Sequence, residues 1–423
     1  MVVEDMKLKM DPKQYGNQKG LGIQHYLVEM LHRILSGVDN NNKGEITAVL
    51  CLFVDWKSAY SNQYHKLGVE SFIENGVRPS LIPLIINYFQ NREMKVKFRE
   101  EISQSRKQPG SGAQGASLGN HEFLSQTNHN ADIVPESDRF KFVDDLSCLE
   151  IINLLSIGLA SHSSRLQVAS DLPVHGQIIE NTHLQSQVYL DEISRWTSNQ
   201  KMLLNESKTK AMVVNFTNNY QFTTRLNLNA TNIDMVDHMK ILGTTINNQL
   251  DWNMNCKNII SKVNKRMVFL RKILSFGASQ SEMVHLWKTY CRSVLEQSAV
   301  VWQGGLTKEN RDDLERTQKT FTKLVLKNRY QTYEESLQRL NLTTLELRRD
   351  QICLKFALNC RKNERTKHLF PLDDKKQHYE LRKISAYMVH NANTERLKRS
   401  PIIYMQNLLN KHHESRMITK RPG

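Results

Sequence analysis

Apolar and polar positions in the first hundred residues alternate between helical and strand-like periods. Residues 22–37 carry apolar side chains at the spacing of an amphipathic helix, which predicts a helix ending near Gly37. The run ITAVLCLFVD, ending at Asp55, is almost unbroken in β-branched and aliphatic residues, which is typical of a short strand buried on both faces. Residues 79–91 look helical again, and residues 94–98 alternate like a strand.

The pattern after residue 100 changes from mixed to helical. Residues 103–120 are rich in Gly, Ser and Gln and predict a loop, and a helix around 185–202 and a strand at 211–216 follow. From about residue 254 nearly every segment has a helical period. One apolar stripe there consists of Ile259, Val263, Met267, Leu270 and Leu274, and the cations Lys262, Lys265 and Arg266 lie off it. The sequence TTLE predicts a capping box from Thr343 to Glu346. The pattern as a whole predicts an α+β domain followed by a helical one.

Two adjacent acids stand between two strand-like runs in RFKFVDDLSCLE at 139–150. Neighbouring carboxylates repel each other and resist ionising together, so the placement of Asp144 beside Asp145 is unfavourable unless something offsets it. A divalent cation would do so, since hard cations such as magnesium prefer carboxylate oxygens. A solvated hairpin turn is the alternative, because Asp is a common turn residue.

The net charge of +15 is distributed unevenly along the 423 residues. Residues 1–250 hold 24 Lys and Arg against 26 Asp and Glu, whereas residues 251–423 hold 34 against 17. This excess of positive charge in residues 251–423 favours a surface that binds a polyanion, most simply nucleic acid, over an ordinary solvated basic face.

The apolar runs and the cysteines indicate the cellular compartment of the protein. The N-terminus has no apolar stretch of signal-peptide type, and the run at 151–160 is too short to span a bilayer, so we expect an intracellular, cytoplasmic or nuclear, non-membrane protein that is not secreted. Six scattered cysteines without a CxxC pair fit a reducing compartment. Cys353, Cys360 and His368 suggest a zinc site, but seven-residue spacing also places both cysteines on one helix face as core residues.

Five motifs occur in an order that resembles the reverse transcriptases of non-LTR (LINE-like) retrotransposons. They are FVDWKSAY (53–60), GAQGASLG (112–119), FVDD (142–145), LNESKTKAMVVNF (204–216) and KILGTTI (240–246). KQYGNQKG (13–20), VLEQSAVVW (294–302) and LELRRD (345–350) are also similar to family segments, so the resemblance covers nearly the whole chain.

The resemblance implies a right-hand polymerase: a palm with an antiparallel sheet and flanking helices, followed by a basic helical thumb. Asp55, Asp144 and Asp145 match the family's catalytic acids, which would hold two Mg²⁺ or Mn²⁺ ions about 3.5–4 Å apart for nucleotide addition. The implied nucleotide-binding residues are the Trp56 carbonyl, Tyr60 under the incoming sugar, Gln114 and Gly115 in the loop along the nucleotide, and Lys208 near the pyrophosphate.

Simpler interpretations exist for two of these residues. Tyr60 could be a core tyrosine, and Lys208 an exposed surface lysine. The family's upstream fingers and an endonuclease domain have no counterpart in these motifs, and Ala113 replaces a proline. We therefore expect a truncated element with three regions: 1–45, a remnant of the fingers; 46–250, the palm with partial fingers; and 251–423, the basic thumb and C-terminal region, where Lys262, Lys265 and Arg266 would bind nucleic acid.

Two classes of function follow from these observations. The first is an RNA-directed DNA polymerase, whose partners would be an RNA template, a DNA primer and deoxynucleoside triphosphates. The second is a catalytically weak remnant that only binds nucleic acid. An unrelated metal-dependent phosphohydrolase is disfavoured by the Gln-Gly loop between the acids.

Overall fold

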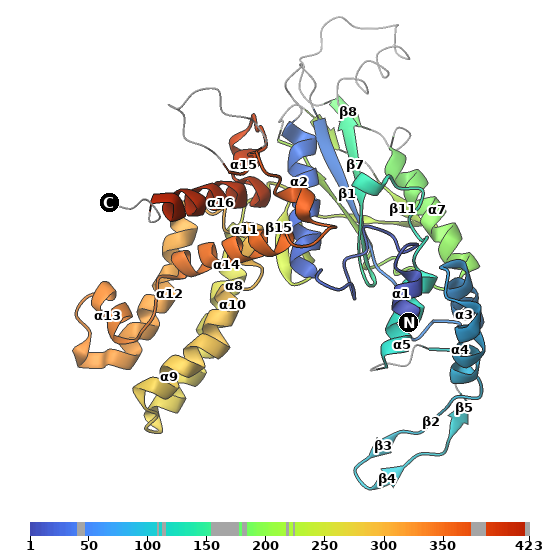
Figure 1. Ribbon diagram of the computed structural model, residues 1–423, viewed down its shortest axis with the longest axis horizontal. Coiled ribbons are helices and arrows are strands. Elements are labelled where there is room, and N and C mark those ends of the chain that lie inside the picture. Colours follow the sequence, from blue (N-terminus) through green and yellow to red (C-terminus); the bar gives the residue numbers. More distant parts are fainter. Residues whose placement is uncertain are drawn as a thin grey trace, which may run out of the picture. The chain divides into compact units, whose positions relative to one another are not determined.

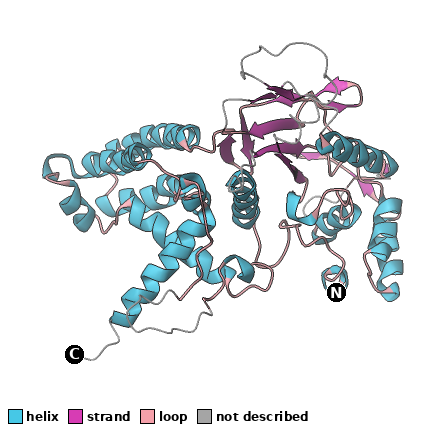
Figure 2. Ribbon diagram, turned by 90° about the horizontal axis from the view of Figure 1, so that it is seen from above, coloured by secondary structure: helices cyan, strands magenta, loops and turns pink. Residues whose placement is uncertain are grey.

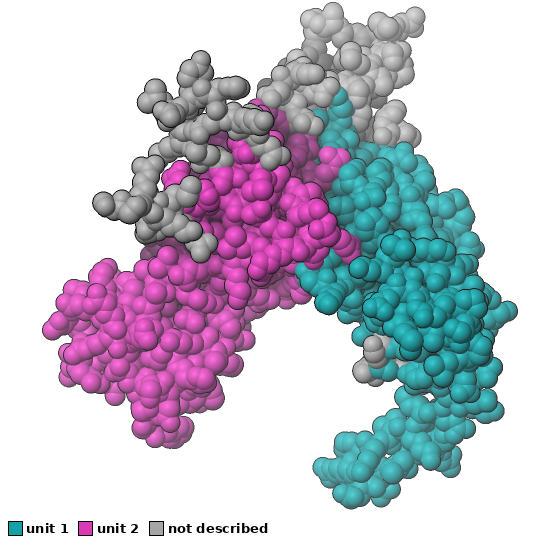
Figure 3. All heavy atoms as spheres, viewed as in Figure 1, with its two compact units in different colours: residues 1–22, 45–236 teal, residues 23–44, 237–423 magenta. Residues whose placement is uncertain are grey.

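The chain folds into two compact units, shown in different colours in Figure 3. The computed structural model describes residues 1–39, 47–107, 110–111, 116–153, 177–179, 184–216, 220–222, 225–373 and 386–418. Unit 1 comprises residues 1–22 and 45–236, and unit 2 comprises residues 23–44 and 237–423.

A five-stranded sheet forms the centre of unit 1, and its strands are gathered together in Figure 2. Its order is β13-β9-β1-β7-β6, and every neighbouring pair is antiparallel except β13 with β9. The strands are β1 (Thr47–Val54), β6 (Arg139–Phe142), β7 (Asp145–Asn153), β9 (Lys210–Val214) and β13 (Asp234–Met235). The predicted strands at 46–55 and 211–216 and the aspartate hairpin are therefore confirmed.

All eight residues of β1 are buried, as its unbroken apolar run predicts. Alternate residues of β1, from Ala48 to Val54, join one core cluster with Phe123 and with Leu190 and Ile193. This cluster covers one face of the sheet with two helices, α5 (Ser117–Gln126) and α7 (Gln185–Asn199). The ends of β1, β7 and β9 are consequently held by a shared core.

Unit 1 also contains further helices and small two-stranded sheets, of which β2 to β5 project away from the core beyond α4 (Figure 1). A second apolar cluster joins α1, α3 and α4 through Met6, Phe72 and Phe89. The helices are α1 (Val2–Met6), α3 (His65–Glu74) and α4 (Ile82–Phe89), with 3-10 turns at Pro79–Leu81 and Glu136–Asp138. The paired strands are β2 (Glu93–Met94) with β5 (Arg106–Lys107), β3 (Lys97–Phe98) with β4 (Glu101–Ile102), β8 (Gln177–Ile179) with β10 (Tyr220–Phe222), and β11 (Asn227–Leu228) with β12 (Thr231–Asn232). The strand predicted at 94–98 is thus split into β2 and β3.

The described part of unit 2 consists of helices and one hairpin, as the change of pattern near residue 254 predicts. The hairpin consists of β14 (His238–Ile241) and β15 (Thr244–Asn247). The helices are α2 (Ile23–Asp39), α8 (Asn253–Ser275), α9 (Gln280–Leu286), a π-helix (Trp287–Arg292), α10 (Ser293–Leu295), α11 (Ala299–Trp302), α12 (Lys308–Leu326), α13 (Tyr333–Arg339), α14 (Leu345–Cys360), α15 (Glu395–Lys398) and α16 (Pro401–Ile418), with 3-10 turns at Lys327–Arg329 and Lys367–Leu369.

The two units divide the chain differently from the boundaries expected at 45 and 250. Helix α2, expected in a fingers remnant, belongs to unit 2, where it contacts α11, α15 and α16. Leu35 on α2 packs with Leu397 and Ile403, two residues that lie hundreds of positions further along the sequence. The hairpin β14–β15 also belongs to unit 2, since β15 contacts α8.

The predicted capping box at 343–346 is wrong by one residue. Thr344 is the N-cap of α14, and its side chain accepts a hydrogen bond from the Leu347 amide. The Thr343 carbonyl instead accepts a hydrogen bond from Gln318 Nε2 at 2.9 Å, and Glu346 forms an ion pair with Arg311. Contacts with α12 therefore decide where α14 begins.

The cysteines behave as core residues. Cys353 and Cys360 are both fully buried on α14, and burial raises the pKa of each thiol, to about 12 for Cys360. His368 is exposed. Zinc binding needs deprotonated thiolates, which these sites disfavour. Across the described ranges, no helix combines the length and apolar character that a membrane span needs.

Candidate functional site

Three acids predicted from the sequence meet at one end of the sheet in unit 1. Strand β1 pairs with β7 so that Val54 lies opposite Leu146, which makes Asp55 and Asp145 the next residues along this ladder. Asp144 precedes Asp145 in the two-residue turn between β6 and β7, where Phe142 pairs with Asp145. An antiparallel arrangement brings the end of one strand to the start of its neighbour, so residues 90 positions apart become neighbours.

The three carboxylates influence one another electrostatically. Burial, followed by the charges of Asp144 and Asp55, raises the pKa of Asp145 to about 6. The pKa of Asp55 is raised as well, mainly by burial and further by Asp144, against the opposing effect of Lys208. The acids are therefore neighbours, and the ionised forms of Asp55 and Asp145 are disfavoured by burial and by the nearby negative charge.

The backbone around Asp55 is fixed by the LNESKT segment. The Asp55 amide donates to Thr209 Oγ1 at 3.2 Å, and its carbonyl accepts from the Asn205 amide at 2.8 Å. The Lys208 ammonium lies 3.9 Å from Asp55 Oδ2, a buried oxygen that accepts no hydrogen bond from the described residues. Lys208 itself is 69% exposed. A buried carboxylate oxygen without a donor is suited to a cation.

Tyr60 and Trp56 lie next to the acids. The ring of Tyr60 stacks on Phe123 of α5 with centroids 5.0 Å apart, and burial together with the charge of Asp144 raises its pKa. Tyr60 is thus partly buried but still within the field of an acid. Trp56 is buried and pairs with Leu204 in an isolated bridge. The two hydrogen bonds of this bridge are accepted by the Asp55 and Leu203 carbonyls, so the Trp56 carbonyl accepts neither of them.

The turn that carries Asp144 is held by the N-terminal segment. Val143 has φ of +59°, a left-handed conformation that β-branched residues rarely adopt. Gln14 is buried, and its Oε1 accepts hydrogen bonds from the Val143 amide at 3.0 Å and the Gly16 amide at 2.9 Å. A Cβ atom on Gly16 would lie 2.5 Å from Val143 Cγ2, so the close approach requires glycine.

A buried ion-pair cluster anchors the same segment. Lys141 on β6 lies 2.7 Å from Asp11 Oδ2, and Arg139 donates to the same oxygen at 2.9 Å. Burial lowers the pKa of Lys141, and Asp11 opposes this shift. Sequence reasoning missed Asp11, Gln14 and Lys141, because no periodicity links residues about 130 positions apart; the resemblance of KQYG to a family segment was the only signal.

Other predicted residues fall elsewhere. Gln114 and Gly115 lie outside the residues that the structure describes. Lys262 and Lys265 are exposed on α8 in unit 2, and Arg266 is half-buried there. Within the described ranges, no three His, Cys, Asp or Glu side chains form a ready-made metal site.

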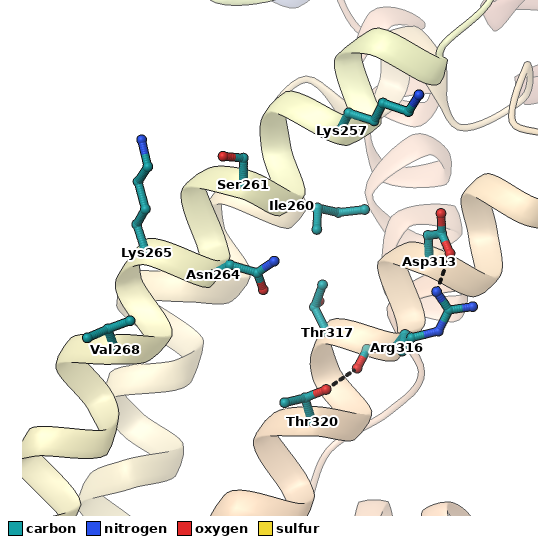
Figure 4. A pocket seen from close by; sticks show the side chains of 10 residues that line it. All are labelled: Lys257, Ile260, Ser261, Asn264, Lys265, Val268, Asp313, Arg316, Thr317 and Thr320. Atoms are coloured by element: carbon teal, nitrogen blue, oxygen red, sulfur yellow. Dashed lines mark hydrogen bonds and ion pairs between the residues drawn. The ribbon is translucent and has the colours of Figure 1, made fainter.

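The basic residues of α8 line two hollows in unit 2. A groove of about 740 Å³ between α8 and α12 is lined by Lys257 and Lys265, by Arg316 in an ion pair with Asp313, and by apolar, hydroxyl and amide side chains. Figure 4 shows these residues, with the side chains of Asn264 and Thr317 in the space between the two helices. A second pocket of about 340 Å³ shares Ser261 and Lys265 with this groove and is also lined by Lys240 and Lys262 among others.

The second pocket is suited to an anion. None of the described residues that line it is acidic. Asn255 lines it and is buried, and its Nδ2 donor has no hydrogen-bond partner among the described residues. Ammonium groups and an unused amide donor together favour a phosphate-like ligand.

Comparisons with known proteins give distant structural similarities only. No protein-family model matches the chain, and neither does any curated protein. It is similar to telomerase from Candida tropicalis in complex with the TWJ fragment of telomeric RNA, with TM-score 0.37, 10% identity and coverage of 96% of this chain and 53% of that one. It is also similar to apo telomerase from Candida tropicalis (TM-score 0.38, 12% identity, coverage 85% and 58%) and to the RNA complex of telomerase from Candida albicans (0.38, 10%, 85% and 51%). The chain spans about half the length of these structures. Because the TM-scores are low, the functional proposal rests on the residues of this chain.

Proposed function

We propose that the chain is an RNA-directed DNA polymerase, a reverse transcriptase of the non-LTR retrotransposon type. The observation that carries the proposal is the meeting of Asp55, Asp144 and Asp145 at one sheet end, where burial and the charges of neighbouring acids raise the pKa values of Asp55 and Asp145. Such an arrangement is unfavourable for stability unless cations neutralise it, which is what a nucleotidyl-transfer site requires.

The chemistry matches these side chains. Two bound Mg²⁺ or Mn²⁺ ions would stabilise charge on the attacking and leaving oxygens of an in-line phosphoryl displacement. Asp55 and Asp144 would hold them, with Asp145 and the Trp56 carbonyl in support. A complete protein cage is not needed, because magnesium is usually held by one or two carboxylates together with substrate phosphates.

Nearby residues have complementary roles in this proposal. Tyr60 would lie under the sugar of the incoming nucleotide and exclude a 2′-hydroxyl, the group that distinguishes RNA from DNA precursors. Its stacking on Phe123 would keep the ring in place. Lys208 pairs with Asp55 at 3.9 Å in this structure and would turn to the pyrophosphate when a triphosphate enters. Gln114 and Gly115 would lie along that nucleotide.

Unit 2 would bind template and primer. Residues 251–423 hold 34 Lys and Arg against 17 Asp and Glu, and the pocket and groove beside α8 present Lys240, Lys257, Lys262 and Lys265 to solvent-filled space. Lysines arranged in this way neutralise backbone phosphates, and affinity should then fall steeply with salt, with a slope of about −0.9 per contact on duplex DNA.

A second candidate function is nucleic-acid binding without catalysis. The concentration of positive charge in residues 251–423 favours it, because that charge supports binding whether or not the acids act.

Primer extension on an RNA template with Mg²⁺ or Mn²⁺ tests the proposal. Asp55→Asn and Asp144→Asn should each lower extension by about 10²–10³-fold or more, since each removes charge stabilisation worth several kcal/mol. Asp191→Asn, which alters an exposed acid on α7, is the matched control and should leave extension unchanged. Absence of extension by the unmodified chain, with template binding intact, would favour the second candidate.

A further inference from the structure

Helix α8 carries six basic residues and no acid of its own. Its 23 residues include Lys257, Lys262, Lys265, Arg266, Arg271 and Lys272 and no Asp or Glu. Like charges three and four positions apart destabilise a helix, so this composition is unfavourable for the isolated element. A polyanion lying along the helix would remove the repulsion.

One face of α8 combines these cations with aromatic rings. Residues three and four apart share a helix face, which places Lys262, Arg266 and Phe269 in one stripe, and Phe276 follows as the C-cap of the helix. The stripe is separate from the core face, where Val263, Met267 and Leu270 are buried. Phe269 is 51% exposed and Phe276 is 88% exposed, although large apolar side chains are usually buried.

Phe269, Tyr290 and Arg266 form a compact group on this face. The rings of Phe269 and Tyr290 meet edge to face with centroids 5.9 Å apart. The Arg266 guanidinium lies 4.5 Å from the centre of the Tyr290 ring, and Arg266 also donates a hydrogen bond to the Tyr290 carbonyl. Tyr290 is 41% exposed. The group is thus ordered by its own contacts but still presents aromatic surface to solvent.

A π-helical turn places Tyr290 in this position. Within Trp287–Arg292 the side chains of Trp287 and Cys291 are fully buried, and Trp287 stacks on Phe321 with centroids 4.5 Å apart. The buried pair anchors the turn and leaves Tyr290 outside. Single π-turns within helices are rare and are frequent at functional sites.

We propose that Phe269, Tyr290 and Arg266 form a stacking platform for the bases of a single-stranded nucleic acid. Lys262 and Lys265 would contact its phosphates from the neighbouring anion-binding pocket on α8. Every base has a π-face that stacks on an aromatic ring, and a cationic surface follows the backbone. A duplex cannot use the platform, because its bases already stack on each other. The inference rests on the proposed nucleic-acid binding by unit 2 and does not depend on polymerisation.

The test measures affinity of the full chain for a fluorescent single-stranded oligonucleotide of uridines and for a duplex of equal length. Phe269→Ala and Tyr290→Ala should each weaken single-strand binding by about 5- to 100-fold while changing duplex affinity less than about twofold. Tyr290→Phe keeps the ring and should bind like the unmodified chain. Tyr88→Ala is the matched control, because Tyr88 is a similarly exposed tyrosine beneath Arg92 but lies in unit 1.

Photocrosslinking needs no variant and tests the same platform directly. The unmodified chain with a 4-thiouridine strand should give crosslinks at Phe269 or Tyr290, mapped by mass spectrometry. Three results would overturn the platform. They are an unchanged single-strand affinity in both alanine variants, an equal loss of affinity for the duplex, and an equal loss of single-strand affinity in Tyr88→Ala.

The outcomes separate this inference from the polymerase proposal. If the Phe269→Ala and Tyr290→Ala variants extend primers and keep full single-strand affinity, the platform alone is refuted. A chain that binds single strands through these rings but never extends a primer would refute polymerisation alone.

Discussion

The carboxyl group of Asp145 is half-buried at the start of β7, beside Asp144 and Asp55. Its pKa of about 6 lies above the ordinary value of 3.8, so the folded state binds a proton more tightly than the unfolded chain does. Between these two values the folded protein is protonated at this site while the unfolded chain is ionised. The contribution of Asp145 to stability is therefore present below about pH 4 and is lost as the pH rises through 6.

Asp145→Asn should consequently stabilise the metal-free protein at pH 7.5, by about 1–3 kcal/mol, and should have no such effect below pH 4. The measurement is urea unfolding at both pH values. Mg²⁺ should raise the unfolding midpoint of the unmodified protein at pH 7.5 more than that of the variant. A variant that is destabilised equally at both pH values would show that Asp145 is neither strained nor a cation ligand.

Gln14 acts on the same site through the backbone of Val143. Gln14→Met keeps the length of the side chain but leaves the Val143 and Gly16 amides without an acceptor, so we expect a loss of about 2–4 kcal/mol in the free energy of unfolding. Amide hydrogen exchange of the 139–150 peptide should also become faster. Gln18→Met is the matched control and should change stability by less than about 0.5 kcal/mol. Equal exchange in both variants would remove Gln14 from this positioning role.

At the scale of elements, the start of α14 is decided by a tertiary contact. The pattern TTLE fits a cap at either threonine. However, Gln318 of α12 donates a hydrogen bond to the Thr343 carbonyl, and Thr344 is the N-cap. Local sequence alone therefore limits the helix start to within one residue.

The two threonines provide an internal comparison. Thr344→Ala removes the oxygen that accepts from the Leu347 amide and should lower stability by about 0.5–2 kcal/mol. Thr343→Ala leaves its carbonyl in place and should cost little. Thermal unfolding of both variants decides the question, and a larger loss for Thr343→Ala would restore the original capping box.

At the scale of the whole molecule, unit 2 is assembled from two separate parts of the chain. Asp39 at the end of α2 accepts hydrogen bonds from the Thr394 amide at 2.7 Å and the Asn393 amide at 2.9 Å. His25 of α2 contacts the Phe356 ring of α14, with ring centroids 4.7 Å apart. Helix α2 is therefore an integral part of the basic unit.

A fragment of residues 237–423 should fold poorly by itself, because α11, α15 and α16 would lose the helix that they contact. We expect a broad thermal transition and rapid proteolysis, and a peptide of residues 23–44 added in excess should sharpen the transition and slow cleavage. A peptide with Leu35→Asp should fail to do so, since Leu35 packs with Leu397 and Ile403. Cooperative unfolding of the fragment alone would show that α2 is dispensable.

The sequence by itself determined the elements whose burial follows a local period. The unbroken run of β1, the hairpin with its paired acids, the apolar stripe of α8 and the buried cysteines of α14 all follow from which side chains avoid water. The order of the acids along the chain also pointed to one shared site.

Tertiary structure alone decided which partner covers each face. The contact of Gln14 with Val143, the placement of α2 in unit 2 and the meeting of Phe269 with Tyr290 join residues that no period relates. Periodicity records that a side chain is buried or exposed, but the identity of its neighbour depends on packing between elements far apart in sequence. For this reason the acids could be predicted from the sequence, whereas the residues that hold their turn could not.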